Sequence, residues 1–167
     1  MKQIVLFSLS MIMSVMLRAD ALPEFTLKAA YLYNFALLTE WPSTKHSNEF
    51  DLCFYREDLG SASDALQNKM IGNRKIKVIN VATAEEAKGC QMIFISENEG
   101  GEGEKLIRHL IGAPILIISE NPRINDAHIA IVREGRRLAF DISLKTLKRS
   151  DLSLSSRLLK LARKVEQ

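Results

Sequence analysis

The stretch GCQMIFISENEGGEGEKLIRHLIGAPILIIS, residues 89–119, decides the fold of this chain. It holds two short apolar runs, 92–95 and 114–118, of the kind that form strands buried on both faces of a sheet. Between them, residues 102–111 have helical spacing and end before Gly112, a residue type favoured just after a helix. A strand, a helix and a second strand in this order predict a parallel pair of strands.

Strands and helices continue to alternate on both sides of this stretch. Further helices are predicted over 24–40, 61–70, 83–88, 144–149 and 155–165. Further strands are predicted over 50–55, 75–81, 129–132 and 138–142, and the last two form a hairpin with Gly135 in its turn. We therefore expect an α/β fold, a single domain with a mixed, mostly parallel sheet, helices on both faces and an antiparallel C-terminal hairpin.

Local signals suggest where the first two helices begin and end. The residue before a proline avoids the helical conformation, so Trp41 and Pro42 are expected to end the first helix. Trp41 is the single tryptophan of the chain and is expected to fill the core beside that helix. Ser61 or Ser63 is expected to cap the second helix.

Residues 1–21 have the order of a secretory signal peptide. Lys2 supplies a positive start, residues 4–17 form an apolar stretch too short to span a bilayer comfortably, and Ala19-Asp20-Ala21 matches a small-x-small cleavage pattern. We expect cleavage after Ala21, which leaves residues 22–167 as one soluble, exported α/β domain. A retained N-terminal anchor is the alternative.

Charge is nearly balanced over the chain but is unevenly placed. The net charge of +3 does not suggest nucleic acid as a partner. Residues 145–167, however, hold seven basic and two acidic side chains. This end suits an acidic partner or an anionic membrane surface, or it is the solvated face of a terminal helix with Arg163 and Lys164 near its negative C-terminus.

The glycine-rich segment 97–104, ENEGGEGE, has the outline of a phosphate-binding loop between a strand and a helix. In detail it departs from that motif. No glycine directly precedes Lys105, and Leu106 stands where a P-loop needs a hydroxyl residue and where the dinucleotide fingerprint needs a glycine. Because its glutamates would also repel a phosphate, we expect a flexible acidic loop and no cofactor.

We recognise no catalytic or metal-binding constellation in the sequence. The three histidines stand in no recognisable spacing with other ligand residues, and we expect structural or surface roles for His46, His109 and His128. Ser155-Ser156 lacks the flanking glycines of a nucleophile elbow, and serines at a helix start more often cap it. We therefore expect neither an enzyme nor a metal site.

Six segments resemble the YfiR-like family of periplasmic proteins. They are KAAYLYNFALLTEWP (28–42), DLCFY (51–55), GCQMIFIS (89–96), APILIISE (113–120), GRRLAFDIS (135–143) and LSLSSRLLKLA (152–162). The first and the last are the more specific. Two features depart from the family pattern: the C-terminal region lacks the second cysteine pair of some members, and Asp126-Ala127-His128 stands where a Gly-Gly pair is common.

The resemblance implies a periplasmic negative regulator. Studied members bind the periplasmic part of an inner-membrane diguanylate cyclase and hold it inactive, and they are relieved by a sequestering outer-membrane lipoprotein or by redox stress. The implied output is cyclic-di-GMP and biofilm formation, and a homodimer is a further expectation. The alternative is a periplasmic small-molecule sensing module that uses the crevice at the carboxyl ends of the strands.

The partner surface is expected at the family-specific C-terminal end, along residues 137–142 and the terminal helix. Its core would be apolar and its rim polar. The expected rim residues are Arg137, Asp141, Arg157 and Lys160. The nearby Phe140, Leu158 and Leu161 are expected to belong to the core of the domain.

Cys53 and Cys90 are the two cysteines of the chain. An oxidising compartment favours a bridge between them, and the resemblance places them at positions that can pair. Strand geometry opposes it, because Cys53 lies late in its strand and Cys90 precedes its own, an offset on the order of 13 Å in adjacent parallel strands. A disulfide needs Cα atoms within roughly 7 Å. Either the loop before Met92 folds back, or the bridge forms only after movement.

Overall fold

A computed structural model describes residues 24–42, 47–56, 60–135 and 137–167. The expected signal peptide and His46 lie outside these residues. The strands are β1 (Thr39–Glu40), β2 (Glu49–Tyr55), β3 (Met70–Ile71), β4 (Arg74–Val81), β5 (Met92–Ile95), β6 (Leu116–Ser119), β7 (Ile129–Glu134), β8 (Arg137–Ser143), β9 (Ser153–Leu154) and β10 (Lys164–Glu166). The helices are α1 (Glu24–Leu37), α2 (Ser61–Leu66), α3 (Ala84–Ala87), the 3-10 turn η1 (Glu97–Glu99), α4 (Gly100–Leu110), α5 (Leu144–Leu147) and α6 (Ser156–Leu161).

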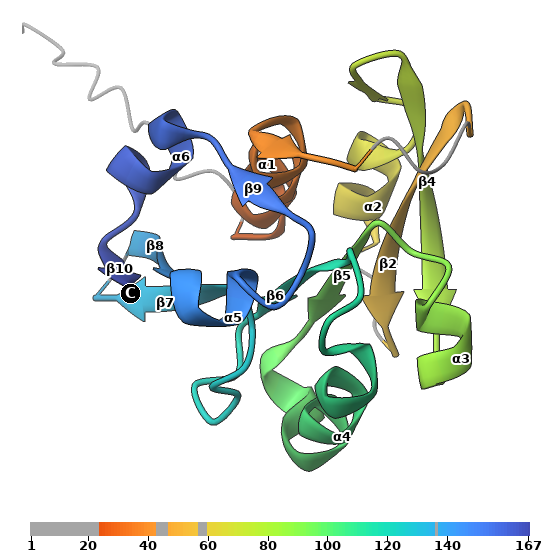
Figure 1. Ribbon diagram of the computed structural model, residues 1–167. Coiled ribbons are helices and arrows are strands. Elements are labelled where there is room, and N and C mark those ends of the chain that lie inside the picture. The colour runs from red at the N-terminus through yellow and green to blue at the C-terminus, as the bar shows by residue number, and fades with distance from the viewer. Residues whose placement is uncertain (1–23, 43–46, 57–59, 136) are drawn as a thin grey trace, which may run out of the picture.

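Within the described residues, eight strands form one sheet in the order β10-β8-β7-β6-β5-β2-β4-β3. The strands from β4 across to β7 are parallel, and β8 turns back antiparallel to β7. The stretch that decides the fold forms the parallel pair β5–β6, as predicted. The mixed, mostly parallel α/β sheet with its C-terminal hairpin is therefore confirmed (Figure 1).

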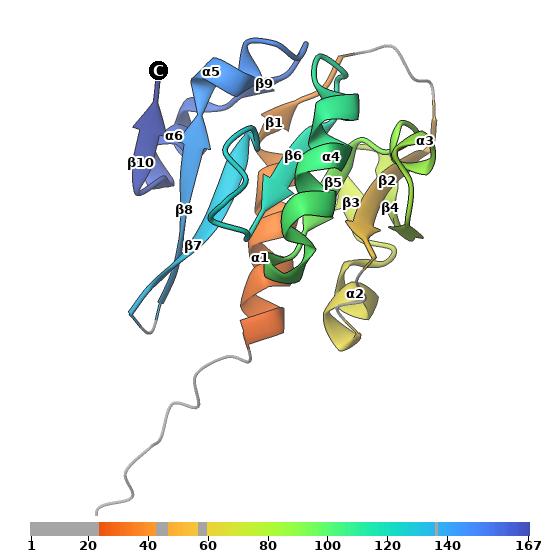
Figure 2. The ribbon, with the colours of Figure 1, turned by 90° about the horizontal axis from the view of Figure 1, so that it is seen from below.

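Helices cover both faces of the sheet, and the alternation of side chains along the strands divides the core in two (Figures 1 and 2). We call the side covered by α1, α2 and α6 the α1 face and the side covered by α3 and α4 the α4 face. Along β2, Leu52 and Phe54 point to the α1 face, whereas Cys53 and Tyr55 point to the α4 face. None of the helices in the described part of the chain is long and apolar enough to cross a membrane.

The first helix ends earlier than predicted, at Leu37, because the next residues pair with a distant strand. Thr39 and Glu40 form β1, which runs antiparallel to β9 in a separate two-stranded sheet. Trp41 packs beside α1 as predicted: its indole N–H donates to the Ala36 carbonyl at 3.0 Å, and its ring meets Phe50 edge-on.

Two other predicted helices are also shorter. Helix α2 ends at Leu66, its N-cap is Gly60 rather than Ser61 or Ser63, and the predicted helical residue Met70 lies in β3. The terminal helix stops at Leu161. Residues 164–166 instead form β10, parallel to β8, so Arg163 and Lys164 do not sit at a helix terminus as predicted.

The acidic segment 97–104 is helical, so the prediction of a flexible loop was wrong. It comprises η1 and the first turns of α4. Gly103 explains how this helix lies so close to the sheet, because a Cβ atom there would come within 2.8 Å of Ile124 and 2.9 Å of Ile95. Gly103 thus serves the packing of α4 against the sheet.

Candidate partner surface and charged cavity

The short helix α6 presents an apolar side chain to solvent. The Ser155 hydroxyl caps the helix by accepting from the Leu158 N–H, as predicted for a serine at this place. Leu158 is buried, but Leu161 is 62% exposed, so the prediction that Leu161 belongs to the core was wrong. Arg157 lies one helical turn before Leu161, on the same side of α6.

The four predicted rim residues do not form one cluster. Arg157 and Lys160 are exposed on α6, and Arg137 is exposed at the hairpin end of β8. Asp141 lies four residues further along β8 and is held by Arg163, whose Nε and guanidinium nitrogens donate to both carboxylate oxygens at 2.8 and 2.5 Å. Asp141 therefore ties β10 to β8, a structural contact that the sequence reading missed.

The structure joins Cys53 and Cys90 in a disulfide, with Cα atoms 6.0 Å apart. The strand register pairs Cys53 with Ile93, so the offset expected from the sequence is real. The turn after α3 folds Cys90 back over β2, where its N–H donates to the Ala87 carbonyl. Both cysteines are buried on the α4 face, so of the two alternatives the folded-back loop holds.

His128 is a buried histidine just before β7, in keeping with the structural role expected of it. Its Nδ1 accepts from the Ile117 N–H at 3.1 Å. Burial lowers the pKa of His128 to about 4, so the ring is neutral at physiological pH. His109 lies on the exposed side of α4 and contacts the Lys105 carbonyl in its own helix. Among the described residues, no group of three acidic, histidine or cysteine side chains is arranged to hold a metal ion.

A charged cluster that the sequence reading missed lies at the carboxyl end of β6. Lys28 of α1 is buried, and its ammonium lies 2.9 Å from Glu120 and 3.1 Å from Glu24. Arg133 of β7 lies 2.6 Å from the same Glu24 carboxylate. Burial acts to lower the pKa of Lys28, but the hydrogen bonds to Glu120 and Glu24 outweigh it and raise that pKa. The sequence offered one signal for this cluster: Lys28 lies on the apolar side of the predicted first helix.

These observations define a class: a single α/β domain with an internal disulfide and an exposed C-terminal surface. The chain belongs to the YfiR/HmsC-like family, whose model matches residues 25–163. No curated protein matches the chain in a sequence comparison. The family is one of periplasmic regulators of diguanylate cyclase signalling rather than enzymes, and a disulfide suits an oxidising compartment.

Proposed function

We propose that this protein, once exported through a cleaved signal peptide, binds the periplasmic part of an inner-membrane diguanylate cyclase and represses cyclic-di-GMP synthesis. The observation that supports this proposal is the membership of the chain in the YfiR/HmsC-like family. Repression needs only a difference in affinity: the protein binds the inactive conformation of the cyclase more tightly and so shifts the population toward it. An outer-membrane lipoprotein that competes for the same surface would relieve the repression, and a homodimer would present that surface twice.

The contact surface we propose consists of α6 and the exposed side of β8, with Arg137, Arg157 and Lys160 on its rim. The supporting observation is the 62% exposure of Leu161. This leucine follows Lys160 directly and lies one turn after Arg157, so an apolar centre has basic neighbours. Asp141 contributes by fixing β10 beside β8 through Arg163. A partner with an apolar patch and an acidic rim is complementary to this surface.

The first test is capture of the partner in the native cells. The exported, tagged protein would be crosslinked in place and its partners identified by mass spectrometry. Recovery of a diguanylate cyclase through its periplasmic segment supports the proposal. Recovery of this chain alone, or of outer-membrane proteins alone, contradicts it.

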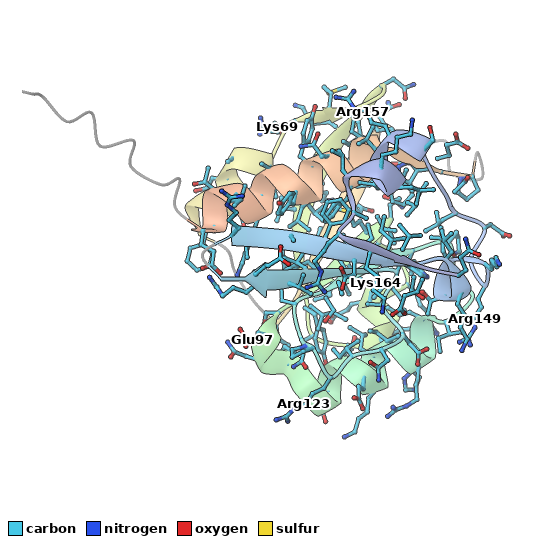
Figure 3. All side chains as sticks on the ribbon, turned by 90° about the vertical axis from the view of Figure 1, so that its left-hand side faces the viewer. Lys69, Glu97, Arg123, Arg149, Arg157 and Lys164 are labelled. Atoms are coloured by element: carbon cyan, nitrogen blue, oxygen red, sulfur yellow. A yellow bond between two sulfur atoms is a disulfide. The ribbon has the colours of Figure 1, made fainter. Side chains whose placement is uncertain are left out.

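A charge reversal then tests the surface itself. We expect Arg157→Glu to weaken binding to the captured cyclase segment roughly tenfold, because it places like charge against an acidic rim. Arg123→Glu is the matched control, since Arg123 is an exposed arginine on the opposite side of the molecule (Figure 3). Affinity would be measured by titration at two salt concentrations. Equal affinity of Arg157→Glu and the native protein would remove α6 from the interface.

A further inference from the structure

A cavity of about 330 Å³ opens where β6 ends and β7 continues. The last pairing between these strands joins Ser119 to Ala130. Beyond it the chain turns away at Asn121 and Pro122, while β7 runs on to Glu134. The cavity therefore lies beside the part of β7 that extends past β6. Its volume is near the lower end of the range for small-molecule sites.

Apolar side chains from two segments line part of this cavity. Ala130 and Val132 are half-buried and share one face of β7, and Pro122 comes from the turn after β6. Ile131 points to the opposite face, where it is buried in the core with Leu138 packed against that core. The apolar portion can therefore cover the hydrocarbon part of a small ligand. Burial of apolar surface supplies affinity in proportion to the area removed from water.

The charged portion of the lining has an excess of carboxylates. Three glutamates and two cations face the cavity: Glu24, Glu97, Glu120, Lys28 and Arg133. Both cations are already paired within the wall, Lys28 with Glu120 and Glu24, and Arg133 with Glu24. Glu97 takes part in no ion pair within 4.0 Å among the described residues, whereas the other two glutamates do. The net charge of the lining is −1, which follows from these five residues.

The position of Glu97 is fixed by the turn after β6. Asn121 is buried, and its side-chain Nδ2 donates to the Glu97 carbonyl at 2.6 Å. The Asn121 Oδ1 accepts from the Arg123 N–H, and the Asn121 backbone N–H donates to the Ser119 hydroxyl. The start of η1 is thus held against the end of β6, which fixes the backbone of Glu97 beside the cavity, while the Glu97 side chain is exposed at the rim.

We propose that this cavity binds a small aliphatic amine in its protonated form. The ammonium group would lie at Glu97, and the carbon chain would lie against Ala130, Val132 and Pro122. An anion suits the cavity poorly, because it would have to take the buried Lys28 ammonium from its two carboxylates, which breaks a buried ion pair. This site is distinct from the α6 surface and does not depend on the proposed function.

Titration with alkylamines of increasing length tests the proposal. Amide resonances of the exported protein would be followed at physiological salt with propylamine, butylamine and pentylamine. We expect saturable shifts around Glu97, Asn121 and Arg133, with affinity rising by up to about fourfold for each buried methylene. The neutral 1-pentanol and the anion pentanoate keep the carbon chain and change the charge, and they should bind at least tenfold more weakly.

A charge-neutralising variant locates the bound ammonium. Glu97→Gln should weaken alkylamine binding about tenfold or more, because it removes the carboxylate that has no ion pair in the wall. Glu102→Gln is the control, since Glu102 is exposed on α4, pairs with Lys105 and does not line the cavity. Absence of saturable shifts in the native protein, equal binding of 1-pentanol, or unchanged affinity of Glu97→Gln would overturn the proposal.

Discussion

The two faces of the central sheet are held together in different ways. Among the residues that the structure describes, the α1 face contains twenty-two buried core residues and the α4 face fourteen. Strand alternation sends the phenylalanines of β2 and β5 to the α1 face, where Phe54 meets Phe94 edge-on and Phe35 of α1 meets Phe140 of β8 in the same way. The stability of the larger α1 face therefore comes largely from burial of aromatic side chains.

The α4 face has aliphatic side chains and one tyrosine, and it is covered by the four-residue helix α3 and the eleven-residue α4. Three specific contacts stabilise this face: the disulfide, the hydrogen bond from the Ile117 N–H to the buried His128, and the close packing of Gly103 against the sheet. The stability of the smaller α4 face thus depends on a few specific contacts, whereas that of the larger α1 face depends on the amount of apolar surface that is buried.

The largest expected effect comes from removal of the disulfide. Replacing Cys53 and Cys90 together by alanine should lower the free energy of unfolding by about 4 kcal/mol, since the bridge closes a long loop and constrains the unfolded chain. Chemical denaturation would measure this loss. Hydrogen exchange should also show that amides of α3 and α4 lose protection before those of α1. Equal loss of amide protection on the two faces would contradict the proposed difference in how they are stabilised.

Regular elements were predictable from local pattern, and distant contacts were not. The strand 92–95 matches β5 residue for residue, and 75–81 falls within β4, because apolar runs and alternation are local signals. The C-terminal signature has helical spacing to its end, yet residues 164–166 pair with β8 as β10, and the neighbouring Arg163 is held by Asp141, twenty-two residues earlier in the sequence.

In the candidate sites, too, the local features were predictable from the sequence and the contacts between distant residues were not. The cap at Ser155 and the exposed basic residues of α6 were predictable from the order of residues. The cavity was not, because Lys28 and Glu120 are ninety-two positions apart and meet only through the fold. Leu161 was misjudged because helical spacing alone does not show which apolar residue of a short helix remains in solvent.

The second effect is a pH dependence that arises on the α4 face. His128 has a pKa of about 4 in the folded protein and about 6.5 in the unfolded chain, so between these values only the unfolded chain binds a proton. Its contribution is fully present above pH 6.5 and is lost as the pH falls toward 4, by about 3 kcal/mol. His128→Asn keeps an acceptor for the Ile117 N–H and does not titrate.

Thermal unfolding of the native protein and of His128→Asn at several pH values between 4 and 7.5 would measure this difference. The native protein should lose stability more steeply as the pH falls from 6.5 toward 4, so its advantage over His128→Asn should shrink across this range. Parallel curves would show that the buried ring does not limit stability in acid.

The smallest effect compares two glycines of α4 that differ only in their surroundings. Alanine favours a helix over glycine by about 1 kcal/mol. At Gly101 the new methyl group meets nothing within 4 Å, so Gly101→Ala should stabilise the protein by about 0.5 kcal/mol. At Gly103 it meets Ile124 and Ile95 at under 3.0 Å, and the overpacking should outweigh the helix preference, for a net loss of about 1–2 kcal/mol.

Denaturant titrations of Gly101→Ala and Gly103→Ala would measure the two changes side by side. Opposite signs would mean that the spacing between α4 and the sheet is set tightly enough for one methyl group to matter. Stabilisation by both would mean that Ile124 and Ile95 move aside at little cost, and that the α4 face does not depend on this close contact. The matched pair therefore isolates packing from helix propensity, because the backbone preference enters both variants alike.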